Sequence, residues 1–165
     1  MSHARRFAAL ATAATAAIAA APATAAAYAG HGHATTLRLT TGNIVVTPTD
    51  LGAPGKTPGD TYAYIGDVFQ DGKTVGKVYG THTSLGVVGD REILQGLITF
   101  RIGRSEIMAG GMAAYPADSQ SGTVIDEPFK RPIIGGTGRY DGARGTLTTV
   151  RNPDGTYSQR FRLLR

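Results

Sequence analysis

A period-two alternation of apolar and polar residues runs from Thr36 to the end of the chain, and it restricts the fold more than any other feature. At its start, Leu37 and Leu39 alternate with Arg38 and Thr40. Alternation of this kind is typical of a β-strand with one buried face. The alternating runs are short, glycine-rich turns separate them, and none has a helical period. The sequence therefore predicts an all-β domain.

Turn signals divide this region into about eight strands. Asp71-Gly72 is typical of a hairpin, and the three prolines and two glycines of 48–58 predict a loop. Many short strands joined in this way favour either a sandwich or a barrel. The expected strands are 36–47 with a break at Gly42, 61–70, 74–88 (one long strand or two short ones), 92–102, 105–114, 129–134, 146–150 and 157–163.

The first 27 residues have the order of a secretory signal peptide. Arg5 and Arg6 form a basic segment, 7–21 is an uncharged alanine-rich run, and Ala25-Ala26-Ala27 is a small-residue cleavage site. The apolar run is shorter than the ~20 residues of a membrane-spanning helix, so no stable membrane insertion is expected. We therefore predict a secreted, extracellular protein with a signal peptide at 1–27, a flexible tail at 28–35 and one β-domain at 36–165.

Composition excludes several classes of site. The chain has no cysteine, which removes thiol catalysis and thiolate metal ligands and leaves a small exported domain without disulfides. Such a domain must be held by its core or by oligomerisation. Loss of Arg5 and Arg6 would lower the formal net charge from +5 to +3, which does not indicate a nucleic-acid partner. His31 and His33 lie among glycine and alanine near the new N-terminus, so no metal site is expected there.

The densest glycine segment runs from Gly135 to Gly145 and contains five glycines. It departs from the dinucleotide-binding fingerprint, because Asp141 stands where the third glycine belongs. A strand-like run, 146–150, follows it in place of a helix. A tight connection that feeds a strand is the better interpretation.

The same segment carries a family resemblance. Gly135-Gly136-Thr137-Gly138, followed after a short spacer by Ala143-Arg144-Gly145, resembles the late signature of dirigent proteins and of the wider allene oxide cyclase barrel superfamily. Gly59-Asp60, Asp67-Val68-Phe69 and Val75 to Gly80 resemble earlier family segments in the same order. The resemblance spans nearly all of the β-domain. It implies an eight-stranded antiparallel β-barrel that holds one small ligand and assembles as a homotrimer.

The resemblance also implies catalytic candidates. Arg144 matches the arginine that lines the dirigent ligand pocket, and it shares strand parity with Tyr140, so both are expected to point inward. Asp67 matches the second residue of an aspartate pair implicated in activating the dirigent substrate, whereas Gly66 replaces the first. We therefore expect Asp67 and Arg144 to be catalytic, with a solvated aspartate and a surface arginine as the alternatives.

Aromatic residues on the expected strands are candidates for ligand binding. Tyr62, Tyr64, Tyr79 and His82, together with Tyr140, could hydrogen-bond a ligand or simply pack. The sequence has no recognisable metal-ligand spacing, phosphate-binding loop or Ser-His-Asp order, so neither a metal nor a cofactor is expected.

Two functions stay open. The first is a secreted barrel that binds a small hydrophobic or aromatic molecule and steers its cyclisation or coupling without a cofactor, a cyclase-like or isomerase-like activity. The second is a non-catalytic extracellular binding or structural barrel. A cavity of several hundred Å³ with convergent polar groups would support ligand handling, whereas an interior filled with side chains would support the structural role.

Overall fold

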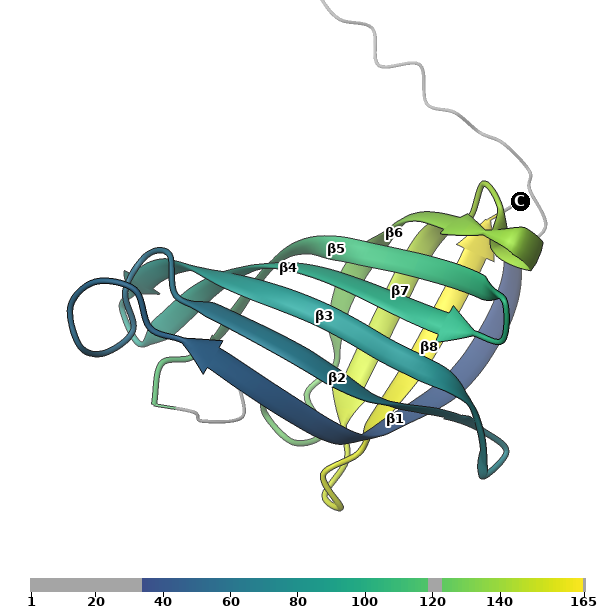
Figure 1. Cartoon of the computed structure of the whole chain (residues 1–165), viewed down its shortest axis with the longest axis horizontal. Helices are drawn as coiled ribbons and strands as arrows, with labels where there is room; N and C mark the ends of the chain where they lie inside the picture. Colours follow the sequence, from purple (N-terminus) through teal and green to yellow (C-terminus); the bar gives the residue numbers. More distant parts are fainter. Residues whose placement is uncertain (1–33, 119–122, 165) are drawn as a thin grey trace, which may run out of the picture. The chain divides into compact units, whose positions relative to one another are not determined.

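The computed structural model describes residues 34–118 and 123–164. Within them, eight antiparallel strands form a closed barrel in which each strand pairs with its neighbours in sequence and β8 pairs with β1 (Figure 1). The predicted eight-stranded antiparallel barrel is confirmed. The elements are β1 (Ala34–Thr49), β2 (Thr61–Gln70), β3 (Lys73–Val88), β4 (Arg91–Ile102), β5 (Ser105–Pro116), β6 (Phe129–Thr137), the short 3-10 helix η1 (Gly138–Tyr140), β7 (Arg144–Arg151) and β8 (Tyr157–Leu164).

Most of the predicted N-terminal segment is outside the part of the chain that the structure describes. The expected signal peptide at 1–27 and most of the expected tail at 28–35 lie outside the described residues. The first strand begins at Ala34, slightly before the expected start of the β-domain. In the part of the chain that the structure describes, no helix is long and apolar enough to cross a membrane.

Bulges interrupt the two longest strands at positions that contain glycine. The pairing of β1 with β2 shifts register between Gly42 and Val45, where Asn43 adopts a φ of 52°. The pairing of β3 with β4 shifts register between Ser84 and Gly86. A bulge bends a strand and increases its twist, which lets a 16-residue strand follow the curve of the barrel. The expected break at Gly42 is a bulge within one continuous strand, and β3 is one long strand.

The glycine-rich segment is a tight connection that feeds a strand, as predicted. β6 ends at Thr137, η1 forms a single turn, and β7 begins at Arg144. A Cβ at Gly136 would collide with the carbonyl oxygen of Tyr140. Gly138 adopts a φ of 61°, which is uncommon for other residues. The glycines therefore let the backbone fold closely back on itself.

Inward-pointing apolar side chains fill one half of the barrel interior, which we call the packed half. Val68, Ile107, Leu147 and Phe161 are all at most 1% exposed there. The ring of Phe161 meets that of Phe100 edge to face, with 4.9 Å between the centroids. Each of these residues alternates with an outward neighbour on its strand, so the period-two pattern assigns them to the interior.

Candidate functional site

The other half of the interior, which we call the open half, is a cavity of about 480 Å³. Residues from all eight strands line it, together with Lys56, Thr123 and Gly155 from the connecting loops. Val78, Ile98 and Phe100 belong both to the cavity wall and to the apolar core, so they form the floor between the two halves. The wall is mostly apolar, with a few polar groups.

Two aromatic rings lie against the wall because glycines on the neighbouring strands leave space for them. Tyr64 of β2 pairs with Gly80 of β3, where an added Cβ would collide with the tyrosine ring. His82 of β3 pairs with Gly96 of β4, where an added Cβ would collide with the imidazole. The two ring centroids are 5.4 Å apart. The glycines therefore help to set the positions of both rings.

Arg131 on β6 lines the cavity and is only 2% exposed. Its Nη2 donates a hydrogen bond to the hydroxyl of Tyr115 at 2.5 Å and lies 3.3 Å from Nε2 of His82. Its guanidinium carbon lies 4.6 Å from the ring centroid of Phe129, within the range of a cation–π contact. None of these partners is an acid. Among the described residues, Arg131 is thus a buried cation without an ion-pair partner.

The surroundings of His82 keep its imidazole neutral. Burial, followed by the charge of Arg131, lowers the pKa of His82 from 6.5 to about 4. Because an arginine only donates hydrogen bonds, Nε2 of His82 must accept from Arg131, and the ring proton then lies on Nδ1. Burial also raises the pKa of Tyr64 and of Tyr115 above the ordinary value of 10.0. At neutral pH this cluster carries a single positive charge, on Arg131.

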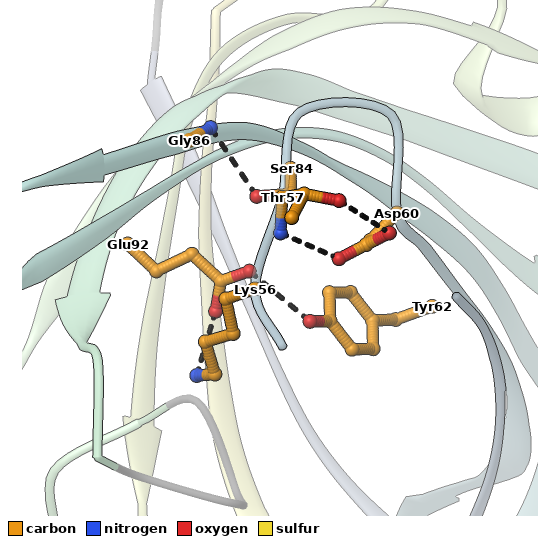
Figure 2. A network of polar contacts seen from close by, with 7 residues as sticks. All are labelled: Lys56, Thr57, Asp60, Tyr62, Ser84, Gly86 and Glu92. Carbon is orange, nitrogen blue, oxygen red and sulfur yellow. Dashed lines mark hydrogen bonds and ion pairs between the residues drawn. The ribbon is translucent and has the colours of Figure 1, made fainter. Parts of the chain in front are cut away.

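A second polar group lies at the more exposed end of the cavity, where the side chain of Lys56 is 29% exposed. The buried carboxylate of Glu92 forms an ion pair with Lys56 at 2.7 Å. The hydroxyl of Tyr62 donates to the same carboxylate at 3.1 Å (Figure 2). Burial, followed by this hydrogen bond, raises the pKa of Tyr62 to about 12. The charges in this group are paired, in contrast to that of Arg131.

Asp60 holds the loop that carries Lys56. Its carboxylate accepts the backbone N–H groups of Leu51 at 2.8 Å and Thr57 at 2.7 Å, which lowers the pKa of Asp60. Its backbone carbonyl accepts the N–H of Ser84 on β3 at 2.7 Å. Figure 2 shows the loop turning back onto this strand. Lys56 is therefore presented to the cavity from a fixed loop.

The chemistry that the open half can support is that of ionic and hydrogen-bonding side chains. Within 34–118 and 123–164, no group of three or more His, Cys, Asp or Glu side chains is placed to hold a metal ion. The polar groups described above can orient a ligand, donate hydrogen bonds to developing negative charge, and transfer protons. They are Arg131, His82, Glu92, Lys56 and the hydroxyls of Tyr62, Tyr64 and Tyr115.

The structure brings three of the predicted ligand-binding residues together. Tyr62, Tyr64 and His82 all line the cavity. Tyr62 and Tyr64 are two residues apart and so point to the same side of β2, and Tyr62 pairs directly with His82 across β2 and β3. Their position fits the predicted role, and binding itself stays a prediction.

Asp67 and Tyr79 do not line the cavity. Asp67 lies between the buried positions of β2, so its side chain faces outward, where it forms an ion pair with Lys77 at 2.7 Å. It also accepts a hydrogen bond from Asn43 at 2.8 Å, and these two partners lower its pKa. Tyr79 is 41% exposed on the outward side of β3. For Asp67, the alternative of a solvated aspartate describes its surroundings better than that of a pocket acid.

Arg144 and Tyr140 also lie away from the cavity, and the expectation that Arg144 points inward is corrected. Tyr140 is buried in the packed half, with the guanidinium of Arg139 4.7 Å from its ring centroid. Arg144 is exposed, and its Nη1 donates to the carbonyl of Ala143. The parity argument failed because η1 and the turn after it separate the two residues. On β7, Leu147 points inward, and Arg144 lies an odd number of residues away from it, so Arg144 is on the outward face of the strand.

The sequence pattern did not identify Arg131, Tyr115 or Glu92 as site residues. Arg131 lies two residues before the buried Ile133 on β6, and Glu92 lies two residues before the buried Leu94 on β4, so each shares the inward face of its strand. A charged residue in the inward register of a strand is the signal that could have identified both, because a buried charge requires a partner. Tyr115 lies just beyond the expected end of its strand, so the pattern gave no such signal for it.

Comparisons with known proteins find structural neighbours for this barrel. No family model matches the sequence, and no curated protein sequence matches it. Among solved structures, a pyocyanin demethylase matches with 27% identity and a TM-score of 0.66, covering 78% of this chain and 99% of that one. The Diels–Alderase AbmU from Streptomyces koyangensis matches with 19% identity and a TM-score of 0.61, covering 82% and 71%.

A dirigent protein, the pterocarpan synthase GePTS1, is a further match, with 19% identity, a TM-score of 0.51 and coverage of 79% and 88%. At such low identity, the Diels–Alderase and the dirigent protein show the fold alone. The structural neighbours thus include both dirigent and cyclase-like barrels, which agrees with the resemblance noted in the sequence.

Proposed function

We propose that this chain is a secreted barrel that binds a small hydrophobic or aromatic molecule in its open half and steers the cyclisation or coupling of that molecule. The observation that carries the proposal is the cavity of about 480 Å³, in which apolar walls surround a few convergent polar groups. An interior filled along its whole length would have supported the structural alternative instead.

Steering of this kind requires that one reactive conformer be held. The floor residues Val78, Ile98 and Phe100 and the rings of Tyr64 and His82 give the cavity a fixed shape. Arg131 and the hydroxyl groups supply directional contacts. The structural neighbours named as a Diels–Alderase and as a pterocarpan synthase are barrels of the same fold, which supports this class of reaction.

The test identifies the small molecule that stays bound in the cavity when the protein is purified. Protein purified from culture supernatant is extracted with organic solvent, and the extract is analysed by mass spectrometry. Val46→Trp places a large side chain on the cavity wall at a position that is 51% exposed, whereas Thr47→Trp places it at the next residue, which is exposed and does not line the cavity. We expect a retained compound in the wild type and in Thr47→Trp, and loss of the compound in Val46→Trp.

The retained compound or its precursor is then incubated with each protein, and the distribution of cyclised or coupled products is measured. A product ratio that the wild type changes and Val46→Trp does not would support steering. Binding without conversion would instead favour the non-catalytic binding barrel. Equal retention by the wild type and Val46→Trp would contradict binding in the open half.

A second candidate reaction is demethylation of an aromatic compound, since the pyocyanin demethylase matches over 99% of its length at 27% identity. Pyocyanin is therefore a suitable first probe. Incubation of the wild type with pyocyanin, followed by mass analysis for loss of a methyl group, tests this candidate directly. Unaltered pyocyanin would leave cyclisation or coupling as the proposed chemistry.

Export and assembly are parts of the same proposal. Intact-mass measurement of the secreted protein should show that residues 1–27 are absent. For the homotrimer, a suitable surface exists on the outside of the barrel, where Val45 pairs with Ile65 and Ile65 pairs with Tyr79, each more than 40% exposed. Light scattering should give a trimer for the wild type and smaller species for Ile65→Lys. A monomeric wild type would contradict the assembly.

A further inference from the structure

We propose that Arg131 and Tyr115 form an oxyanion-binding site in the open half, which takes the carboxylate or phenolate oxygen of a flat aromatic molecule. The site lies in the cavity that we propose handles a small molecule, so this proposal rests on the proposed function. It specifies the chemical class of the ligand and identifies the two donors that recognise it.

The hydrogen bonds of Arg131 leave donors for a ligand. Both hydrogens of Nη2 are used, one by Nε2 of His82 and one by the hydroxyl of Tyr115. Among the described residues, Nε has no hydrogen-bond partner, and no hydrogen bond is made by Nη1. Three of the five N–H donors of a guanidinium are therefore unpaired on a side chain that is 2% exposed. A buried donor without an acceptor is destabilising, so the cavity favours a ligand that supplies one.

The hydroxyl of Tyr115 can serve the same ligand. Its oxygen accepts a hydrogen bond from Arg131, so its own hydrogen must point elsewhere, and the described residues offer it no other partner. Tyr115 is 5% exposed and lines the cavity. Its O–H group and Nη1 of Arg131 are thus two donors on side chains that the hydrogen bond from Nη2 holds together. Two preorganised donors in a buried pocket are the usual basis of an oxyanion site.

An anionic acceptor is favoured over a neutral one because no group among residues 34–118 and 123–164 balances the charge of Arg131. His82 is neutral, since its pKa is lowered to about 4, and Tyr115 is neutral, since burial raises its pKa. The buried carboxylate of Glu92 is already paired with Lys56. An oxyanion on the ligand would supply the missing charge through a charge-assisted hydrogen bond.

The groups around Arg131 favour an aromatic ligand. The ring of Phe129 lies 4.6 Å from the guanidinium and 5.9 Å from the ring of Tyr115, measured between centroids for the rings. The ring of His82 lies 6.2 Å from that of Tyr115 and 5.4 Å from that of Tyr64. A flat molecule can pack against these rings while its anionic substituent reaches Arg131.

The experiment compares charged and neutral probes of similar shape by calorimetric titration. The probes are 2-naphthoate and its neutral isostere 2-naphthamide, with 4-nitrophenolate at mildly alkaline pH as a separate test of phenolates. We expect the wild type to bind at least one of the two anions about ten- to a hundredfold more tightly than 2-naphthamide, which is the range of a charge-assisted hydrogen bond. Comparison of the two anions shows whether the site prefers carboxylates or phenolates.

Two variants test the assignment to these residues. Arg131→Gln should weaken anion binding by about ten- to a hundredfold and leave 2-naphthamide binding nearly unchanged. Tyr115→Phe removes only the hydroxyl and should weaken anion binding roughly two- to tenfold. Arg144→Gln is the matched control, because this arginine is exposed and does not line the cavity. Circular dichroism and thermal melts verify that each variant folds. If Arg131→Gln fails to fold, the anion preference of the wild type and its reduction in Tyr115→Phe are the measurements that test the proposal.

The outcomes separate this site from the proposed function. If the wild type binds 2-naphthamide as tightly as both anions, the oxyanion site is overturned and the ligand-binding cavity survives. If an anion preference exists but persists in both variants, another group recognises the anion and the assignment to Arg131 and Tyr115 fails. If no probe binds, the open half does not accept flat aromatic anions and the oxyanion site is overturned, whereas the proposed function is then decided by the compound that the cavity retains from culture.

Discussion

The packed and open halves of the barrel are formed by the same strands but use their inward positions differently. In the packed half the inward residues are aliphatic or aromatic, and they contact one another, as Phe100 and Phe161 do. In the open half, large rings are opposed by glycine: Tyr64 faces Gly80, and His82 faces Gly96. Each ring occupies the space that its glycine leaves against the wall, and the centre of this half stays open as a cavity.

Buried polar groups of the open half differ in how they are satisfied. Near the floor of the cavity, Thr149 donates to Gln159 at 2.7 Å, and Gln159 donates to Thr41 at 3.1 Å, so these three side chains satisfy one another. Arg131 in the open half retains unpaired donors at similar burial. We infer that the packed half supplies most of the folding free energy, whereas the open half keeps interaction capacity for a ligand.

The largest expected effect tests this division of stability. Phe161→Ala should lower the free energy of unfolding by about 3–5 kcal/mol, because it opens a void among fully buried neighbours. Phe129→Ala, at a partly buried wall position of the open half, should lower it by roughly 1–2 kcal/mol, because the truncated side chain already faces a cavity. Urea unfolding of the two variants gives the comparison. Equal losses would contradict a division of roles between the halves.

The next prediction concerns the dependence of stability on pH. Because the pKa of His82 is about 4 in the folded protein and near 6.5 when unfolded, the unfolded state binds a proton first as the pH falls. The contribution of His82 is therefore complete above about pH 6.5 and is lost progressively toward pH 4, reaching about 3 kcal/mol at most. Urea unfolding between these pH values measures the slope.

The matched control for this slope is His82→Gln, which retains an acceptor for Arg131 but does not titrate. The variant should be less sensitive to pH in this window. Asp60 and Asp67 also have lowered pKa values, but their contribution falls mainly below the ordinary carboxylate value of 3.8, so they interfere little above about pH 5. Identical slopes in the wild type and His82→Gln would show that the imidazole is not held neutral by the open half.

The difference between the halves also explains what could be predicted from the sequence. The strands followed from local alternation, in which Phe100 and Phe161 each stand between two polar residues. The same alternation puts Tyr62 and Tyr64 on one side of β2. It could not show which inward residues pair with a glycine on the neighbouring strand, because that depends on the register between strands. The turns and the bulges at Gly42 and Gly86 shift this register.

The candidate site was predictable only in part, for related physical reasons. Arg144 was expected to be inward from its parity with Tyr140, but a single turn of 3-10 helix between them reset the register. Arg131 lies in a short strand next to a proline and carries no recognisable motif, so only its register relative to Ile133 indicated that it is buried. Its contacts with Tyr115 and His82 join residues far apart in the chain, which the sequence pattern does not reveal.

A smaller effect is expected where the glycines define the cavity. Gly80→Ala should lower the free energy of unfolding by about 1–3 kcal/mol, because the new Cβ would force the ring of Tyr64 to move within a packed wall. The displaced ring should also weaken ligand binding in the open half. Thr81→Ala, on the exposed outer side of the same strand, is the control and should change neither quantity appreciably. Wild-type behaviour of Gly80→Ala would show that Tyr64 is mobile and does not shape the cavity.

The smallest expected effect tests the paired charges at the exposed end of the cavity. Tyr62→Phe removes one donor to the carboxylate of Glu92 but leaves the ion pair of Glu92 with Lys56. The free energy of unfolding at neutral pH should therefore fall by about 1 kcal/mol. Above about pH 10 the comparison becomes sharper. Because the pKa of Tyr62 is raised to about 12 in the folded protein, the unfolded state loses this proton first, and stability should fall as the pH rises from 10 toward 12. Tyr62→Phe should reduce this alkaline loss, whereas Tyr79→Phe, on the outer surface, should not. An unchanged alkaline profile in Tyr62→Phe would mean that the hydroxyl is solvated and that Glu92 is held by Lys56 alone.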